Sequence, residues 1–272
     1  MSECSLVHEK IGTRPAEQST QRICVMGNSH VAALKGGWSE GAPVRNDLEL
    51  DFFGALSDGM FSLGLVDGKL EPLEPEAAIF FRNISGLGTG VSPEKYDAFI
   101  LCGMGMFLTS VFKSYELFAT PGTRKTDAPH FVSDACIHDL AWDQIDGSMM
   151  MHCARLVRSV TDKPVFLVWQ AFWSETLFDI QWRRDQMKPI LKNGDQAYIR
   201  TAMADTGGRL TDEGFAVLTQ PEHTVADGVM TKAEFSRGSV RFRQSMDQKH
   251  RENDVFHMNS AYGRACWEAW LT

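Results

Sequence analysis

The sequence has no Cys-x-x-Cys pair, no excess of basic residues and no long hydrophobic run. Its six cysteines stand singly, and together with the eight histidines they show no metal-ligand spacing, so neither a disulfide framework nor a metal centre is expected. With 27 basic against 35 acidic residues, the net charge of -8 argues against nonspecific nucleic-acid binding. No apolar run approaches the ~18 residues of a membrane span.

Composition places the chain among ordinary globular proteins. A hydrophobic content of 43% and a charged content of 23% are typical of that class, and 272 residues can bury one sizeable core. Residues 1–21 are polar and lack the apolar centre of a secretion signal, which predicts a disordered tail followed by a single domain at 22–272. Reduced thiols and the lack of a signal favour a cytoplasmic protein.

Short apolar runs alternate with segments of helical periodicity along most of the chain. Strands are predicted at 22–26, 48–53, 97–102, 164–169 and 215–219, and helices from Ser29 to Gly36-Gly37, at 134–161 and at 185–205. This alternation predicts a three-layer α/β/α fold with a mostly parallel, five-stranded sheet, whose sites lie beyond the carboxyl ends of the strands. Three further segments complete the prediction: a β-hairpin insertion at 61–73 turning at Asp67-Gly68, a strand at 78–82, and irregular structure near the pocket at 107–131.

Ser29 lies between the first predicted strand and the first predicted helix, after a turn at Gly27-Asn28. A strand–turn–helix unit presents such a serine at the carboxyl edge of the sheet, beside the free N–H groups of a helix N-terminus. This position suits a nucleophile whose reaction develops negative charge. A plain helix N-cap is the other interpretation of the same serine.

The other end of the chain supplies a base for that serine. Asp254 precedes His257 by three residues, so it can orient the imidazole from within one loop turn. Apolar residues from Met258 to Trp270 recur at helical spacing, which places His257 at the entry to a closing helix. His30 is a further imidazole beside Ser29, and we expect it to pack or to bond locally.

Together, the Gly-Asn-Ser-His block at Ser29 and the Asp-x-x-His block at His257 resemble the SGNH (GDSL-type) serine hydrolase family. The resemblance implies a flavodoxin-like sheet and a serine esterase with Ser29 as nucleophile, His257 as base and Asp254 as its partner. It implies that Gly54, after the second strand, donates its N–H to an oxyanion hole. Asn28 departs from the family, since it stands where an Asp is usual.

The largest departure from the family lies after the third strand, where Gly105 stands in place of an Asn that supplies an oxyanion donor. Three alternatives are open: the N–H of Gly105 serves instead, the side chain of Asn28 or Asn83 reaches in, or the hole has only two donors. Losing one donor typically costs about 100–1000-fold in rate. Gln170 and Trp173 follow the fourth strand and are candidates for ligand contact at the same edge.

The implied substrate is a small acyl ester, with an O-acetylated sugar as one member of that class, and no cofactor is implied. Two alternatives accompany the esterase. One is a weak or inactive relative that binds a glycan or a partner, suggested by the missing Asn. The other is an O-acyltransferase using the same triad. The segment from Lys232 to Arg251 is rich in basic residues and is either a lid, a clamp for an anion or a solvated surface.

Overall fold

The computed structural model describes residues 20–41, 45–85 and 87–271. Most of the predicted tail therefore lies outside the described residues, although Gln21 already opens the first strand. The central sheet runs in the order β2-β1-β5-β8-β9, and every neighbouring pair is parallel. Its strands are β1 (Gln21–Gly27), β2 (Leu48–Gly54), β5 (Ala98–Cys102), β8 (Val165–Val168) and β9 (Ala216–Leu218). The predicted fold class is confirmed.

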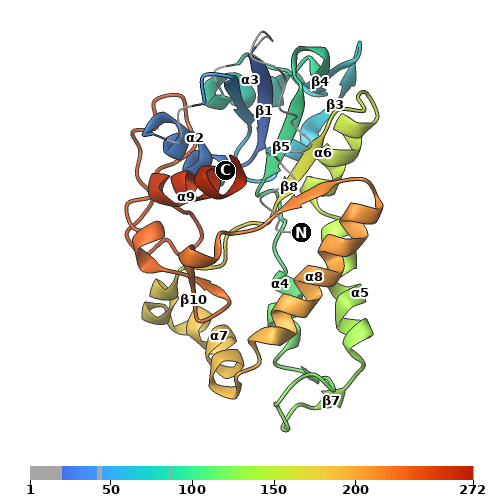
Figure 1. Cartoon of the computed structure of the whole chain (residues 1–272), viewed down its shortest axis with the longest axis vertical. Coiled ribbons are helices and arrows are strands. Elements are labelled where there is room, and N and C mark those ends of the chain that lie inside the picture. The colour runs from blue at the N-terminus through green and yellow to red at the C-terminus, as the bar shows by residue number, and fades with distance from the viewer. Residues whose placement is uncertain (1–19, 42–44, 86, 272) are drawn as a thin grey trace.

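Helices cover both faces of this sheet (Figure 1). They are α2 (Val31–Ser39), α3 (Pro75–Ser85), α4 (Thr109–Ser114), α5 (Asp134–Asp146), α6 (Met149–Arg158), α7 (Gln181–Asn193), α8 (Gln196–Asp212) and α9 (Ser260–Leu271). Alternate residues of β1 point to opposite faces: Ile23 and Val25 pack with α2 and α9, whereas Cys24 and Met26 pack in the core shared with α5, α6 and α8. In the described part of the chain, no helix has the length and apolar character needed to cross a membrane.

Three short strand pairs lie outside the central sheet: β3 (Leu63–Val66) with β4 (Lys69–Pro72), β6 (Phe118–Ala119) with β7 (His130–Phe131), and β10 (Val225–Ala226) with β11 (Met230–Thr231). The hairpin of β3 and β4 is the predicted insertion. Its turn residues Asp67 and Gly68 have φ values of +50° and +76°, as a type I′ turn requires. The segment 107–131, predicted to be irregular, contains α4, β6 and β7 instead.

Three further expectations are corrected by the structure. Residues 78–82 lie within α3, which begins at Pro75 with Glu76 in its first turn, and both are favourable residues at a helix start. The helix predicted at 134–161 is broken between α5 and α6, where the Ser148 side chain accepts from Met151 N–H and starts α6. The helix predicted at 185–205 is broken at Gly194, whose φ of +72° ends α7 before α8 begins.

The helices that follow Ser29 and His257 cross in backbone contact. A Cβ added at Gly263 of α9 would lie 1.8 Å from the carbonyl oxygen of Ala33 in α2, and one at Gly37 would lie 2.2 Å from the backbone nitrogen of Arg264. Only glycine permits so close an approach. The predicted end of the first helix at Gly36-Gly37 is therefore wrong, because Gly37 lies inside α2 as a packing residue.

Candidate active site

Ser29 lies in the turn between β1 and α2, two residues beyond Gly27. The helix begins at Val31, slightly later than predicted, and its N-cap residue is His30, which makes no side-chain cap hydrogen bond. The hydroxyl of Ser29 instead lies 2.8 Å from Nε2 of His257. A contact of this length is a hydrogen bond between a hydroxyl and a potential general base.

Asp254 fixes the orientation of His257 through both carboxylate oxygens. Oδ2 lies 2.9 Å from Nδ1 of His257, and Oδ1 accepts from the backbone N–H groups of Phe256 and His257, each at 2.9 Å. Burial raises the pKa of Asp254, but hydrogen bonds from His250 and His257 outweigh it and hold that pKa well below its usual range. A charged Asp254 keeps the proton of His257 on Nδ1, which leaves Nε2 free to accept the proton of Ser29.

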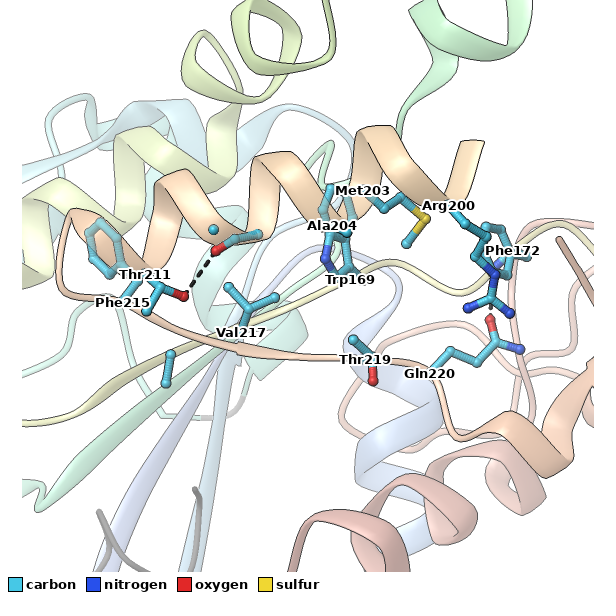
Figure 2. A pocket seen from close by; sticks show the side chains of 13 residues that line it. Trp169, Phe172, Arg200, Met203, Ala204, Thr211, Phe215, Val217, Thr219 and Gln220 are labelled. Carbon is cyan, nitrogen blue, oxygen red and sulfur yellow. Dashed lines mark hydrogen bonds between the residues drawn. The ribbon is translucent and has the colours of Figure 1, made fainter. Parts of the chain in front are cut away.

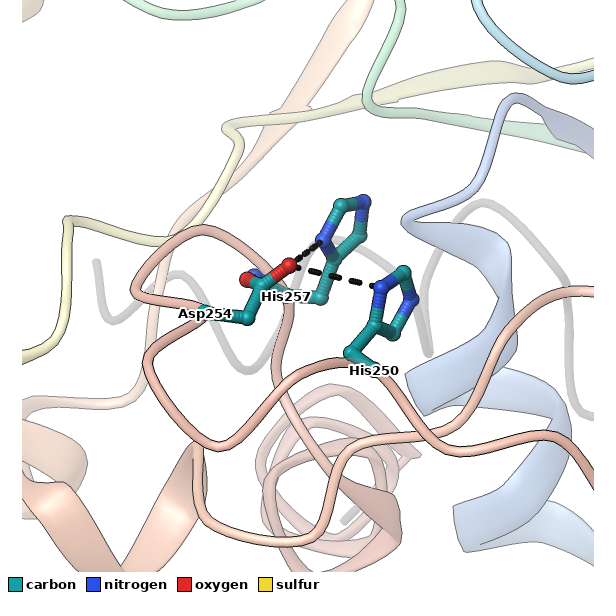
Figure 3. A group of neighbouring side chains, drawn as sticks. All are labelled: His250, Asp254 and His257. Carbon is teal, nitrogen blue, oxygen red and sulfur yellow. Dashed lines mark hydrogen bonds and ion pairs between the residues drawn. The ribbon is translucent and has the colours of Figure 1, made fainter.

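Two more histidines enclose the His257 ring, and the motifs did not assign either of them a part in the site. His250 stacks on one face, with ring centroids 3.9 Å apart and planes 9° from parallel (Figure 3). His30 lies at 4.8 Å with an interplanar angle of 20°. His30 thus packs as expected, but against the His257 ring. The spacing His-x-x-x-Asp-x-x-His is the signal that could have identified His250.

Burial and the neighbouring His257 lower the pKa of His30 to about 3. The ring is therefore neutral across the ordinary pH range and adds no positive charge beside His257. Neutrality matters here because His257 would itself become charged if it took a proton from Ser29. A second cation at this distance would oppose that step.

His250, Asp254 and His257 also bring one potential metal-ligand atom each to within 4.8 Å of one another. The two imidazole rings are nearly parallel, however, so their in-plane lone pairs run side by side and do not converge on one point. Both Nδ1 atoms already face the same oxygen, Oδ2 of Asp254 (Figure 3). The geometry favours a hydrogen-bonded group over a metal site.

Gly54, the predicted oxyanion donor, ends β2 directly beside the end of β1, where it is the register partner of Gly27. A Cβ at Gly54 would lie 1.9 Å from the Gly27 carbonyl oxygen and 3.1 Å from the Phe242 ring. Steric contact alone thus requires glycine here. The role of its N–H in catalysis stays a prediction.

The loop after β5 approaches Asn28 and His30, the two neighbours of Ser29, through Gly103. Gly103, Met104 and Gly105 have φ values of +79°, +51° and +83°, and Met106 N–H closes the turn by donating to Gly103 at 2.9 Å. A Cβ at Gly103 would lie only 2.2 Å from Oδ1 of Asn28, whereas the nearest atom to one at Gly105 belongs to Ser148, at 3.5 Å. Asn28 therefore does reach this loop, at a position two residues before Gly105.

The remaining predicted site residues lie at different places. The backbone N–H of Gln170 donates to Met106 at 3.0 Å, so the segments that follow β5 and β8 are joined at the carboxyl edge of the sheet. Trp173 is buried and stacks with Phe107. Asn83 is an exposed residue of α3. The five described cysteines, at positions 24, 102, 136, 153 and 266, are free thiols.

A cavity of about 390 Å³ lies beside the edge strand β9, away from the triad (Figure 2). Arg200, Met203 and Ala204 of α8 line one side, and Val217 and Thr219 line the other. Ser29, Asp254 and His257 do not contribute to its wall. This cavity is consequently separate from the hydrogen-bonded group described above.

Sheet order and side-chain geometry together define the class of structure: a parallel α/β/α protein with a hydrogen-bonded Ser–His–Asp group at its carboxyl edge. β1 lies between β2 and β5, which is the point where the strand order reverses and where such sheets bind ligands. No protein-family model and no curated protein sequence matches this chain.

Several solved structures resemble it weakly. A GDSL-like lipase from Bacteroides thetaiotaomicron is 11% identical, with 95% of this chain and 89% of that chain covered and a TM-score of 0.37. The periplasmic domain of a lipopolysaccharide acetyltransferase from Salmonella ser. Paratyphi A is 12% identical, with 92% and 82% covered and a TM-score of 0.42. A lipase from a goat rumen metagenome is 12% identical, with 92% and 95% covered and a TM-score of 0.37.

Proposed function

We propose that this protein is a serine esterase that hydrolyses a small acyl ester. One observation supports the proposal above all: Ser29 Oγ, His257 and Asp254 form a continuous hydrogen-bonded chain with distances of 2.8 and 2.9 Å. A hydroxyl, an imidazole and a carboxylate in this order are the parts that activate a serine for attack on a carbonyl carbon.

In the proposed mechanism, the hydroxyl of Ser29 attacks the ester carbonyl while His257 takes its proton at Nε2. The charge of Asp254 stabilises the imidazolium that forms. His257 then gives this proton to the departing alcohol, and an acyl group remains on Ser29. Water, activated by the same imidazole, releases the acid and restores the free serine. Every step uses side chains of this chain and needs no cofactor.

The oxyanion would be held by the backbone N–H groups of Ser29 and Gly54 and by the side chain of Asn28. Ser29 and Gly54 follow neighbouring parallel strands, which supports a shared position for their N–H groups. Oδ1 of Asn28 lies against Gly103, a residue of the loop where the resembled family supplies its third donor, so the Nδ2 amide hydrogens of Asn28 would be the donor. We therefore assign the missing donor to Asn28 in preference to Gly105 or Asn83.

The same triad could transfer the acyl group to an acceptor other than water, which would make the protein an O-acyltransferase. An O-acetylated sugar is the first natural kind of substrate to test, because both a hydrolase and a transferase could take its acetyl group. Adding an unacylated sugar as acceptor separates the esterase from the O-acyltransferase. An esterase releases free acetate at the same rate with and without the acceptor, whereas a transferase forms a new ester on the added sugar.

The test is hydrolysis of para-nitrophenyl acetate and butyrate by the wild type and by Ser29→Ala. Loss of the nucleophile is expected to lower kcat by about 1000-fold or more. Ser159→Ala is a matched control, because this exposed serine of the α6 end bonds only a local carbonyl. A fluorophosphonate probe should label Ser29 in the wild type, as identified by peptide mass spectrometry.

Two results would count against the proposal. Equal turnover by the wild type and Ser29→Ala would remove Ser29 from the chemistry. Absence of both turnover and labelling in the wild type, over short and longer acyl esters, would favour the binding-protein alternative.

A further inference from the structure

His250 shares the carboxylate of Asp254 with His257. Its Nδ1 atom lies 3.3 Å from Oδ2, the oxygen that also faces Nδ1 of His257 at 2.9 Å. The two rings are stacked at 3.9 Å. The side chain of His250 is only 11% exposed, so solvent contributes little to its orientation.

The surroundings of His250 indicate which of its nitrogens carries a proton. Nδ1 faces a carboxylate oxygen and is therefore the donor. Nε2 is buried and has no hydrogen-bond partner among the described residues. A buried N–H without a partner costs more than a bare ring nitrogen, so the tautomer with its proton on Nδ1 fits this environment better than the one with its proton on Nε2.

The backbone around His250 holds the ring in this place. Its N–H donates to the carbonyl of Ser239 at 2.9 Å, and the neighbouring Lys249 forms an isolated bridge with Val240. The segment that carries His250 is thus tied to a second stretch of the chain before it reaches Asp254. A His250 ring fixed at this point can restrain the His257 ring that stacks on it.

We propose that His250 is a positioning residue of the triad, which holds Asp254 by a second Nδ1 contact to its carboxylate and forms one wall of the slot in which the His257 ring lies. This inference rests on the proposed esterase function. His30 forms the opposite wall. Between two rings, the His257 imidazole keeps the plane that aims Nε2 at Ser29 and Nδ1 at Asp254.

Positioning of this kind affects the rate more than binding. Ser29 and His257 must be aligned when the proton moves, and a misplacement of about 1 Å can cost ~100-fold. Substrate affinity depends on other surfaces, so KM should change little.

Two substitutions separate the parts of this role. His250→Asn keeps a side-chain N–H near the position of Nδ1, whereas His250→Phe keeps a flat ring but removes the donor. We expect kcat for para-nitrophenyl acetate to fall about 10–100-fold in His250→Phe with KM nearly unchanged, and to fall less, by about threefold to tenfold, in His250→Asn, which keeps the donor but loses the ring wall. His130→Ala, at an exposed histidine on β7, is the control.

A second readout does not depend on activity. Nitrogen-15 NMR of the ring of His257 should show a single Nδ1–H tautomer in the wild type and in His250→Asn, and a mixture in His250→Phe. Thermal unfolding of each variant shows whether it is folded. A folded His250→Phe with wild-type kcat and an unchanged His257 tautomer would overturn the inference, as would a loss of kcat in both variants without any change of tautomer.

The NMR result also keeps this inference distinct from the proposed function. A wild type without Ser29-dependent turnover would refute the esterase. The tautomer of His257 in the same two variants would still decide whether His250 positions that ring.

Discussion

Ser29 Oγ and His257 Nε2 lie 2.8 Å apart, although 228 residues separate them in the chain. Ser29 lies two residues before the start of α2 and His257 three residues before the start of α9, and those two helices touch backbone to backbone through Gly37 and Gly263. The distance between the Ser29 hydroxyl and the His257 ring is therefore set by rigid helix packing as well as by the loops that carry the two side chains.

Replacing Asp254 by Asn should lower kcat by about 10³–10⁴-fold while the fold is kept. The amide can still occupy the same space, but it no longer holds the proton of His257 on Nδ1 by charge. Steady-state kinetics on a small ester, with circular dichroism as the folding control, would measure this. A loss of less than tenfold would mean that His257 acts without its carboxylate.

Removing the side chain of Asn28 should cost about 100–1000-fold in kcat, since one oxyanion donor is lost. The effect should fall on kcat more than on KM, because the donor binds charge that develops only in the transition state. Asn83→Ala, at an exposed position of α3, provides a comparison. If the Asn28 and Asn83 variants were equally active, the third oxyanion donor would have to be a backbone group such as the N–H of Gly105.

Gly103→Ala should disturb the site, because the new Cβ would meet Oδ1 of Asn28 at 2.2 Å. Gly68→Ala is the matched control: its φ of +76° resembles the +79° of Gly103, but a Cβ there meets nothing within 4 Å. Both variants should lose about 1 kcal/mol of stability from the left-handed backbone. Only Gly103→Ala should also lose esterase turnover, and similar turnover in the two would contradict this.

The low pKa of His30 predicts a pH-dependent loss of stability. Between its ordinary pKa of about 6.5 and the folded value near 3, the unfolded chain binds a proton that the folded chain does not. The free energy of unfolding should thus fall as pH drops through this window, by at most ~1.4 kcal/mol per pH unit, and solvent at the partly exposed residue reduces the slope. Urea unfolding from pH 7 to 4 should show a flatter profile for His30→Gln, and identical profiles would refute the assignment.

Gly263→Ala should destabilise the protein by about 1–3 kcal/mol or more, because its Cβ would overlap the Ala33 carbonyl oxygen. Gly207→Ala offers a contrast within another helix, α8, where an added Cβ meets nothing within 4 Å. That change should stabilise the protein by about 1 kcal/mol through helix propensity. Thermal unfolding would show the two midpoints moving in opposite directions. The same direction for both would mean that α2 and α9 can separate at little cost.

The parts of the fold that follow from local pattern were predictable. Alternation of apolar strands and helices indicated the five parallel strands, and the Asp67-Gly68 pair indicated the hairpin turn. Helix breaks were harder, because Gly147-Ser148 and Gly194-Asp195 interrupt a periodicity that continues on either side. The apolar residues after Pro75 suit a strand or a helix equally, and packing of α3 against β2 decides between them.

The residues of the candidate site likewise fall into those that a local motif predicts and those that depend on contacts between distant segments. Ser29, Asp254 and His257 stand in short motifs, so the sequence could suggest them. The contact between Asn28 and Gly103, and the stack of His250 on His257, depend on how distant segments meet in space. His250 lies within the basic segment from Lys232 to Arg251. The sequence pattern there predicts a lid, an anion clamp or a solvated surface, and it does not single out His250.

The crossing of α2 and α9 also has a consequence for the chain during its synthesis on the ribosome. Protein chains leave the ribosome from the N-terminus onward. Ser29 therefore emerges more than two hundred residues before α9, the helix that follows His257. Under the proposed function, Ser29 on a nascent chain would therefore be an ordinary alcohol, and its reactivity would begin only when α9 has docked. Onset of labelling by a serine-directed probe would accordingly report the moment at which the last described helix closes the fold.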